Sequence, residues 1–165
     1  MNKHFKLYYI DDKYVEFLRK FDKIVAHNKN KTRPYIGIVY TYNNYNYFAP
    51  LSSPKEKHLK MKLSQLDIYK IDNGKLGIIN INNMIPTPTE CLMEVLPTIN
   101  DNTYKNLLEN QLSFINNPIN ATKLLNKINR FQKEYRRNIL PEKILKRCCN
   151  FLLLEEKCNE WEKSN

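Results

Sequence analysis

In the N-terminal part of the chain, apolar residues recur in short runs at strand spacing. Residues 6–10 alternate and carry tyrosine, and residues 35–40 and 46–51 are separated by Asn43-Asn44. Because asparagine tolerates the positive dihedral angles of a tight turn, these last two runs predict a β-hairpin. A polar loop, a second hairpin and one further strand are predicted at residues 53–65, 67–71 with 75–80, and 92–96.

A helical repeat of apolar residues occurs once near the N-terminus and dominates the chain after Thr98. Asp11 or Asp12 predicts the cap of a helix that continues to residue 25. The later helices are predicted from a cap at Asn100 or Asp101 to a break at Pro118, then at residues 120–137, from Pro141, and at residues 151–161. We therefore predict an α+β fold in a single domain, residues 1–165: a compact antiparallel sheet or small barrel with additional helices, mostly C-terminal.

The charge balance indicates an anionic partner. Lys and Arg number 27 against 17 Asp and Glu, a formal net charge of +10. Such an excess suits RNA, DNA or an anionic membrane. No apolar run has the length of a membrane span or of a signal peptide, so we expect a cytoplasmic protein that does not bind a membrane. An A/T-rich coding sequence would also scatter lysine and asparagine along a chain.

The usual metal ligands are poorly spaced for a metal site. Cys91, Cys148, Cys149 and Cys158 form no CxxC pair, the three histidines stand apart, and the acids are dispersed. We expect buried free thiols, no metal and no cofactor.

Residues 123–147 hold nine basic side chains and two acids. On a helix, one set of cations and one set of apolar residues fall on different faces, so the apolar set packs inward and the cations face outward. A solvated surface is the simple alternative, but such surfaces usually alternate Lys with Glu, and phosphate contact is favoured. The residues predicted to bind RNA are Lys29, Lys31, Lys57, Lys105, Lys123, Lys127, Arg130, Lys133 and Arg137.

The strongest chemical signal is the end of an apolar run, Phe48-Ala49-Pro50-Leu51-Ser52-Ser53-Pro54-Lys55. Two hydroxyls and one ammonium follow the run, between two prolines that stiffen the backbone. Such a segment can hold a phosphate and move protons. It contains no carboxylate, Cys or His that could coordinate a metal.

RNA offers a cleavage route that needs no metal, in which the 2′-hydroxyl attacks the adjacent phosphorus. Lys55 suits charge stabilisation and proton transfer, and Ser52 and Ser53 can donate to the non-bridging oxygens. Arg33 can hold the phosphate with two parallel hydrogen bonds. Each residue also has a purely structural interpretation, as a common turn, a surface lysine or the partner of an acid.

At these residues the chain resembles the ToxN/AbiQ family, the endoribonuclease toxins of type III toxin–antitoxin systems. The stretch Tyr47-Phe48-Ala49-Pro50-Leu51-Ser52-Ser53-Pro54-Lys55 is similar to the family's hallmark sequence. Further similar segments follow in order along nearly the whole chain, at residues 5–10, 13–15, 33–39, 76–80, 84–86, 104–105, 111, 114–115 and 150–157.

The resemblance implies a twisted β-barrel related to the Kid/MazF toxins and metal-independent cleavage of RNA, often at adenine-rich sites, in cellular or phage mRNA. The products would carry 2′,3′-cyclic phosphate and 5′-hydroxyl ends. It also implies inhibition by an antitoxin RNA of pseudoknot repeats, which the toxin cuts from a precursor and with which it assembles into a closed protein–RNA complex. Such systems act in plasmid maintenance and abortive infection by phage.

Carried over to this sequence, Ser53 and Lys55 stand at the family's active positions. Ser52 stands where other members have Thr, and Arg33 where they have a cation. The aromatic residue that some members carry before this cation has no clear counterpart. Tyr14 and Tyr35 are the nearest substitutes, with core packing as their simpler role, and Tyr42, Tyr45, Tyr104 and Tyr135 are further candidates for base stacking.

Two other functions compete with the enzyme. One is a non-catalytic RNA-binding protein that uses only the basic helix. The other is a DNA-binding autorepressor, which is disfavoured because no helix-turn-helix spacing is present. Hydroxyls and an ammonium at a strand end favour the endoribonuclease.

Overall fold

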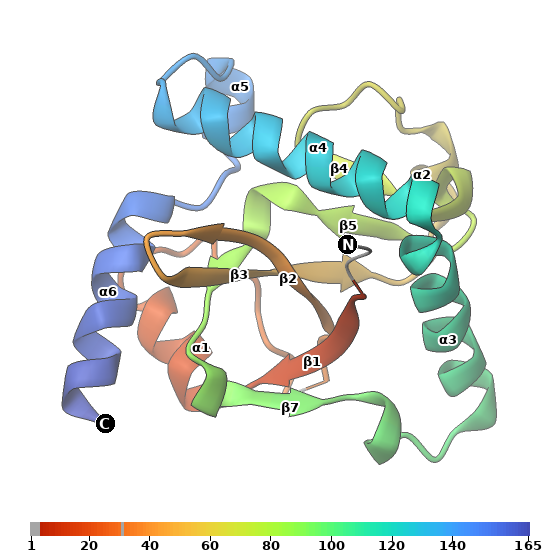
Figure 1. Cartoon of the computed structure of the whole chain (residues 1–165), viewed down its shortest axis with the longest axis horizontal. Coiled ribbons are helices and arrows are strands. Elements are labelled where there is room, and N and C mark those ends of the chain that lie inside the picture. Colours follow the sequence, from red (N-terminus) through yellow and green to blue (C-terminus); the bar gives the residue numbers. More distant parts are fainter. Residues whose placement is uncertain (1–3, 31) are drawn as a thin grey trace.

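The structure is a computed structural model that describes residues 4–30 and 32–165. A curved antiparallel sheet of seven strands occupies its centre, in the order β4-β5-β3-β2-β1-β7, with β6 beside β3 (Figure 1). The strands are β1 (Lys6–Ile10), β2 (Tyr35–Tyr42), β3 (Tyr45–Ser52), β4 (Ile68–Lys70), β5 (Ile78–Asn80), β6 (Ile85–Pro86) and β7 (Leu92–Glu94).

Strand β3 has partners along both edges. On one edge it forms the predicted hairpin with β2, in which Tyr42 faces Tyr45. The turn residues Asn43 and Asn44 have φ values of 46° and 68°, as a two-residue hairpin turn requires. On the other edge β6 and then β5 follow in succession, and Ser52 faces Ile78 at the end of the strand.

The sheet is open. Among the described residues, no strand pairing joins β4 to β7, so the small barrel proposed from the sequence is not closed by hydrogen bonds. Both edge strands are three residues long and run into the 3-10 turns η1 (Ile71–Gly74) and η4 (Leu96–Thr98). Turn η1 returns the chain to the sheet as β5, which pairs with β4, whereas η4 leads from β7 toward α3.

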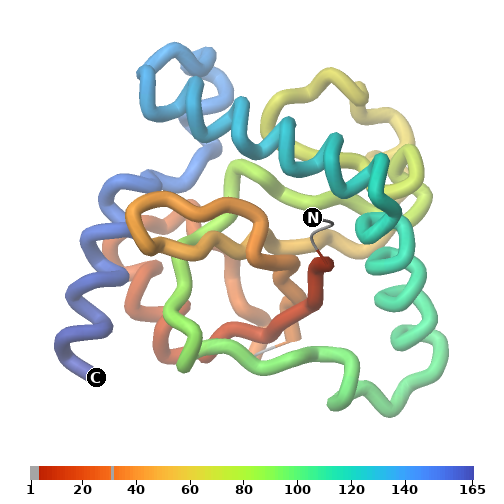
Figure 2. The backbone as a smooth tube through the Cα atoms, in the orientation of Figure 1, coloured from red at the N-terminus to blue at the C-terminus, as the bar shows by residue number. Residues whose placement is uncertain are grey.

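Helices surround the sheet on three sides (Figure 1). In this view α3 stands at one side, α4 crosses above the sheet, and α6 lies with α1 at the opposite side; the backbone trace shows the same arrangement (Figure 2). The helices and remaining 3-10 turns are α1 (Asp12–Arg19), α2 (Glu56–Lys60), α3 (Asn102–Asn116), α4 (Pro118–Arg136), α5 (Glu142–Leu145), α6 (Phe151–Ser164), η2 (Ile81–Asn83) and η3 (Thr89–Cys91).

The helix starts follow local capping chemistry. Asp11 and Asp101 accept backbone N–H groups in the first turns of α1 and α3. Pro118 ends α3 as predicted but also opens α4, because a proline at the first helical position sacrifices no hydrogen bond. Besides the barrel, three predicted segments differ from the structure: α1 stops at Arg19 rather than at residue 25, the predicted loop 53–65 contains α2, and the strand predicted at 92–96 ends at Glu94.

The core forms one cluster of buried residues between the sheet and the helices. Helix α4 contributes Leu124, Ile128 and Phe131, each at most 2% exposed, which confirms its predicted inward face. The four cysteines are buried and free, as predicted. None of the helices among the described residues has both the length and the apolar character needed to cross a membrane.

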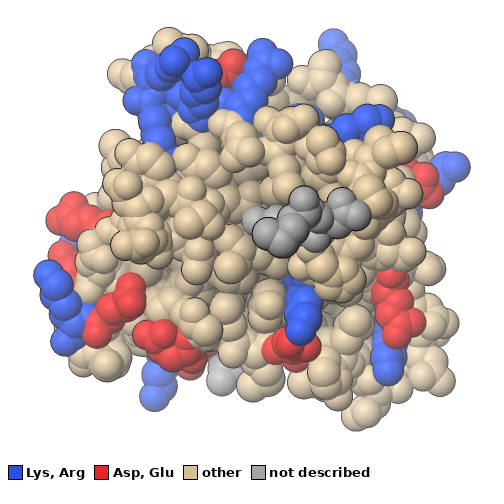
Figure 3. Space-filling model, viewed as in Figure 1, with Lys and Arg blue, Asp and Glu red and all other residues tan. Residues whose placement is uncertain are grey.

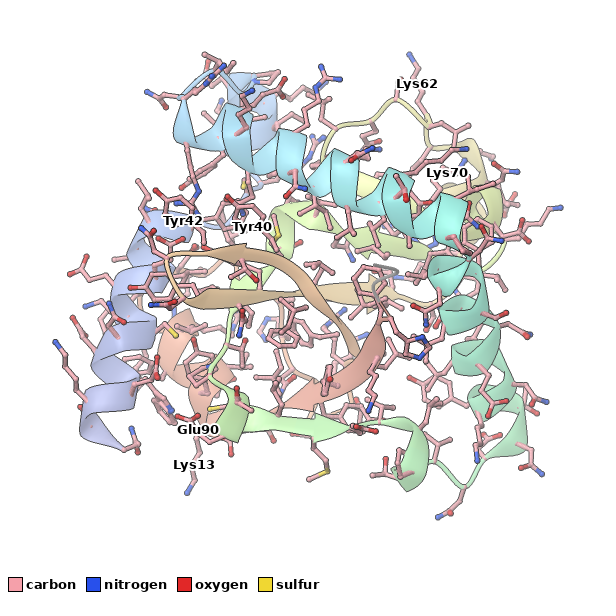
Figure 4. All side chains as sticks on the ribbon, in the orientation of Figure 1. Lys13, Tyr40, Tyr42, Lys62, Lys70 and Glu90 are labelled. Atoms are coloured by element: carbon pink, nitrogen blue, oxygen red, sulfur yellow. The ribbon has the colours of Figure 1, made fainter. Side chains whose placement is uncertain are left out.

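A buried ionic cluster ties the β2–β3 hairpin to the C-terminal helices. The carboxylate oxygen Oε1 of Glu155 accepts from the Tyr47 hydroxyl and from Nη2 of Arg136, both at 2.6 Å. The Arg136 guanidinium also lies 3.7 Å from the ring centroid of Tyr42, which stands with Tyr40 near the hairpin tip (Figure 4). The cluster therefore joins β3, α4 and α6.

Replacement of Arg136 by leucine leaves the Glu155 charge buried without its cation. We expect Arg136→Leu to lower the free energy of unfolding by about 3–5 kcal/mol, measured by urea denaturation. The matched control is Arg137→Leu, the same change at the neighbouring exposed position, which should cost no more than about 0.5 kcal/mol. Equal losses in the two variants would contradict a stabilising role for the cluster.

Candidate active site and RNA-binding surface

A cavity of about 500 Å³ opens where the end of β3 meets β1, the loop before β2 and the start of α3. It brings together all four residues that the sequence nominated for catalysis. The lining residues are Tyr9, Lys29, Thr32, Arg33, Pro34, Leu51, Ser52, Ser53, Lys55, Ile99 and Tyr104. Three of them are cations and none is a carboxylate, so the cavity suits an anion.

Ser52 is held at the last position of β3 by its neighbours. The Asn80 side-chain amide donates to the Ser52 Oγ at 2.9 Å and to the Pro50 carbonyl at 3.3 Å. Gly77, with φ of +97°, packs so closely that a Cβ there would lie 2.1 Å from the Ser52 carbonyl oxygen. Ser53 and Lys55 follow as exposed residues, and Lys55 immediately precedes α2.

Arg33 comes from the loop that precedes β2. Its Nε donates to the His27 carbonyl at 2.7 Å, which orients the guanidinium group. The base of this loop is anchored by the buried Asn28. Its side-chain amide donates to the Ile10 carbonyl at 2.7 Å, and its backbone carbonyl accepts from the N–H groups of Thr32 and Arg33. The loop thus places Arg33 and Lys29 at the same cavity as the end of β3, where the Leu51 N–H donates to the Pro34 carbonyl at 3.0 Å.

Tyr9 and Tyr104 form an aromatic wall with Ile99, and burial raises the pKa of both phenols. Tyr104 was among the tyrosines considered for base stacking. Tyr9 was missed, because the strand pattern of residues 6–10 does not show which loop lies above the strand. Tyr14 and Tyr35, by contrast, are fully buried and serve core packing.

The predicted RNA-binding residues separate into three groups. Lys29 belongs to the cavity, and Lys31 lies outside the described residues. Lys57 on α2 and Lys105 on α3 are close in sequence to the cavity residues Lys55 and Tyr104 but do not line the cavity themselves. The third group comprises the α4 residues Lys123, Lys127, Arg130, Lys133 and, at its C-cap, Arg137.

Two adjacent hollows, of about 370 and 380 Å³, lie between α4 and the segment 61–66 and share Leu63 and Lys127. We call them the α4 hollows. The first is also lined by residues of β4, η1, α3 and α4, which are Tyr69, Lys70, Asn73, Phe114, Asn120 and Lys123. The second contains Ser64, Leu66, Asn126, Arg130, Phe131 and Glu134. Lys133 and Arg137 are exposed but line neither hollow.

Lys127 lines both hollows. Its Nζ donates to the Leu63 carbonyl at 3.2 Å, and burial lowers its pKa. Arg130 pairs with Glu134 at 3.1 Å, which neutralises part of the predicted basic face. On the face shown in Figure 3, Lys and Arg gather over the C-terminal part of α4 and α5, whereas Asp and Glu lie mainly along the lower half.

Among the described residues, no group of three or more His, Cys, Asp and Glu side chains could hold a metal ion. The cavity instead offers hydroxyls, ammonium groups and a guanidinium. This donor set suits a protein that binds phosphodiesters.

Comparisons with known proteins identify the family. A family model described as "Toxin ToxN, type III toxin-antitoxin system" matches residues 6–159. The endoribonuclease ToxN of Pectobacterium atrosepticum is 35% identical over 96% of this chain and 94% of its own length. The endoribonuclease ToxN of Bacillus thuringiensis subsp. kurstaki is 32% identical over 95% of this chain and 84% of its own length. The chain belongs to the ToxN family, and the predicted class, an endoribonuclease toxin of a type III system, is confirmed.

Solved structures show the same fold. The lactococcal anti-phage endoribonuclease AbiQ of a type III toxin–antitoxin system has a TM-score of 0.81 and 26% identity, covering 98% of this chain and 99% of AbiQ. A second structure, which concerns selective toxin inhibition by a non-coding RNA pseudoknot in bacterial type III systems, has a TM-score of 0.78 and 28% identity. It covers 97% of this chain and 99% of that one.

The contact between Gly77 and Ser52 can be tested by Gly77→Ala. The new methyl group would require a strained backbone and would push against the Ser52 carbonyl. We expect a loss of about 1–3 kcal/mol in the free energy of unfolding. Asn106→Ala, at an exposed position of α3, is the control. If thermal and urea denaturation show both variants to be as stable as the parent, Ser52 is not held by this contact.

Proposed function

We propose that residues 1–165 act as one endoribonuclease domain that cleaves RNA in the cavity at the end of β3 without a metal ion. The observation that carries this proposal is that Ser52, Ser53, Lys55 and Arg33 line one cavity that no carboxylate lines. Its cations favour a phosphodiester, and its hydroxyls supply hydrogen-bond donors.

In the proposed reaction, the ribose 2′-oxygen forms a bond to the adjacent phosphorus and the bond from phosphorus to the 5′-oxygen breaks. The products are a 2′,3′-cyclic phosphate and a 5′-hydroxyl. The proton of the 2′-hydroxyl must leave, and the departing 5′-oxygen must gain one. Lys55 serves one of these transfers and stabilises the charge on the phosphorane.

The other groups position and stabilise the phosphate. Arg33 enters the cavity from the loop before β2 and offers its terminal nitrogens to the non-bridging oxygens. Ser52 and Ser53 donate from the strand end, where Asn80 and Gly77 restrict movement of Ser52. Such fixed donors stabilise the transition state because they need no rearrangement during the reaction.

The aromatic wall supplies a surface for the bases beside the cleaved bond. Tyr9 and Tyr104 lie on the cavity wall with Ile99, and tyrosine rings stack on unpaired bases with little sequence preference. A single-stranded RNA segment therefore suits the cavity better than a duplex.

The regulation proposed for this chain follows its relatives. One similar structure concerns toxin inhibition by a non-coding RNA pseudoknot. We extend this to an antitoxin RNA of pseudoknot repeats that the toxin cuts from a precursor and binds in a closed protein–RNA complex, with cellular or phage mRNA as the substrate when the toxin is free. The α4 hollows support a second RNA contact, because Lys123 and Lys127 line one hollow with the aromatic rings of Tyr69 and Phe114. Arg130 adds a cation to the other hollow.

Alanine substitutions test the catalytic proposal. In chelator, Lys55→Ala and Ser53→Ala should cleave a single-stranded RNA about 10²-fold more slowly than the parent or worse, and their expression should not arrest growth. Lys163→Ala is the control, because this exposed lysine of α6 does not line the cavity and is not one of the predicted RNA-binding residues; it should retain cleavage. End analysis should find cyclic phosphate on the parent's products.

Full cleavage by Lys55→Ala and Ser53→Ala would remove these residues from the mechanism. If the parent bound RNA tightly without cutting it, the non-catalytic RNA-binding alternative would be favoured.

Charge reversal tests the α4 surface. In a Ser53→Ala background, which prevents cleavage, Lys127→Glu with Arg130→Glu should weaken antitoxin RNA binding. The slope of log affinity against log salt should fall by about one for each phosphate that the protein no longer neutralises. The control reverses Lys13 and Lys163, on α1 and α6; Lys13 points away from α4 in Figure 4. Unchanged affinity and slope in the α4 variant would show that this face does not touch the RNA.

A further inference from the structure

The turn that presents Lys55 contains a buried histidine. His58 lies in α2, and its side chain is 0% exposed, although α2 otherwise consists of exposed residues. A fully buried imidazole cannot contact an RNA in the cavity. Any effect of His58 on the reaction must therefore act through its neighbours.

The neighbour that His58 holds is Lys55. The Lys55 N–H donates to Nδ1 of the imidazole at 3.1 Å, and the His58 N–H donates back to the Lys55 carbonyl at 2.9 Å. These reciprocal bonds fix the Lys55 backbone, and with it the direction in which the side chain leaves the turn. Since Nδ1 accepts a hydrogen bond, it carries no proton, and the ring is neutral with its proton on Nε2.

The same turn is fixed from the sheet side. Lys70 of β4 donates from Nζ to the carbonyls of Leu59 and Met61, at 3.1 and 2.8 Å. Gly74 of η1 packs against the His58 carbonyl, where a Cβ would lie 2.5 Å away. These contacts fix residues 58–61, so the position of Lys55 relative to them depends on its two hydrogen bonds to His58.

The charged groups that act on the imidazole are cations. Burial, then Lys57 and Lys55 of the same turn and Lys70 of β4, lower the pKa of His58 below its ordinary value. The neutral form is thus the resident form near neutrality. A protonated ring would lose the lone pair that accepts the Lys55 N–H, and it would place a further positive charge among three lysines.

We propose that His58 is a positioning residue whose neutral imidazole holds the Lys55 backbone and so aims the Lys55 ammonium into the cavity. The inference rests on the proposed role of Lys55 in RNA cleavage. It adds a pH limit. Because the folded-state pKa lies below the unfolded-state value, the positioning bond is complete above the unfolded pKa and is lost as pH falls through the folded pKa. Cleavage should therefore decline on the acid side.

Two substitutions separate positioning from simple space filling. His58→Asn keeps a side-chain acceptor that does not titrate, whereas His58→Leu fills space without an acceptor. RNA cleavage is measured in chelator between about pH 5 and pH 8, the range in which histidine titrates. We expect the parent to lose activity at the acid end and His58→Asn to stay near parent activity at pH 7 without that acid limb. We expect His58→Leu to lose about tenfold or more in kcat at all pH values, with KM little changed.

Lys55→Ala is assayed in parallel, so that failure of the proposed function can be recognised separately. If Lys55→Ala cleaves like the parent, the catalytic role of Lys55 fails. If Lys55→Ala is inactive while His58→Leu matches the parent, or if His58→Asn keeps the parent's acid limb, the positioning role of His58 is overturned.

A measurement on the parent protein tests the inference even if the His58 variants do not fold. The chain has three histidines, so ¹⁵N-labelled imidazole signals can be assigned by substituting the other two. We expect His58 to show an unprotonated Nδ1 near neutrality and the Lys55 amide signal to move with the His58 titration. A Lys55 amide that does not follow His58, or a His58 ring protonated at Nδ1 near neutrality, would overturn the inference.

Discussion

Strand β3 is hydrogen-bonded along both edges, and this constraint fixes where the chemistry of the molecule begins. The β2 partner holds one edge, while β6 and β5 divide the other, so the strand cannot slide without breaking three ladders. Its last residue, Ser52, is further enclosed by Asn80 and Gly77. The polar residues that follow therefore start from a rigid point, and Lys55 reaches the cavity through one short, tightly bonded turn.

The cavity and the α4 hollows use different lysine and arginine residues in different ways. In the cavity, Lys29 and Arg33 come from the loop before β2 and Lys55 from the segment after β3, and no carboxylate lines the space between them. Along α4, Arg130 is already paired with Glu134 and Lys127 is held by the Leu63 carbonyl. A site that stabilises a transient charge needs unpaired donors, whereas a surface that holds a folded RNA can combine modest charge with apolar and aromatic contacts. The two regions thus suit cleavage and retention of RNA, respectively.

Much of this fold could be predicted because local signals decide it. Asp11, Asp101 and Pro118 mark helix ends through backbone chemistry, and Asn43-Asn44 defines the hairpin turn. The hallmark stretch from Tyr47 to Lys55 brought three of the four nominated residues to one strand end, and Arg33 joins them in the structure. Local signals do not report how distant segments meet. Tyr9 was missed for this reason, and closure of a barrel was expected although the edge strands are only three residues long.

The role of His58 shows the same limit from another side. In the sequence it is one of three scattered histidines, with no partner at a metal-binding or catalytic spacing. Its significance comes from complete burial and from one hydrogen bond to a backbone three residues earlier. Neither the burial of His58 nor this hydrogen bond can be predicted from periodicity or composition. Both arise when residues 55–61 fold onto β4 and η1.

The central claim is that the ribose supplies the nucleophile and the cavity supplies the remaining groups. The most direct test is cleavage, in the presence of chelator, of a short RNA that carries a single 2′-deoxy substitution at the nucleotide 5′ to the cleaved bond. The account predicts that the all-ribose RNA is cut to a 2′,3′-cyclic phosphate and a 5′-hydroxyl, and that the substituted RNA stays intact at that bond. Cleavage of the substituted bond at the same rate, or cleavage of either RNA only after magnesium is added, would contradict it.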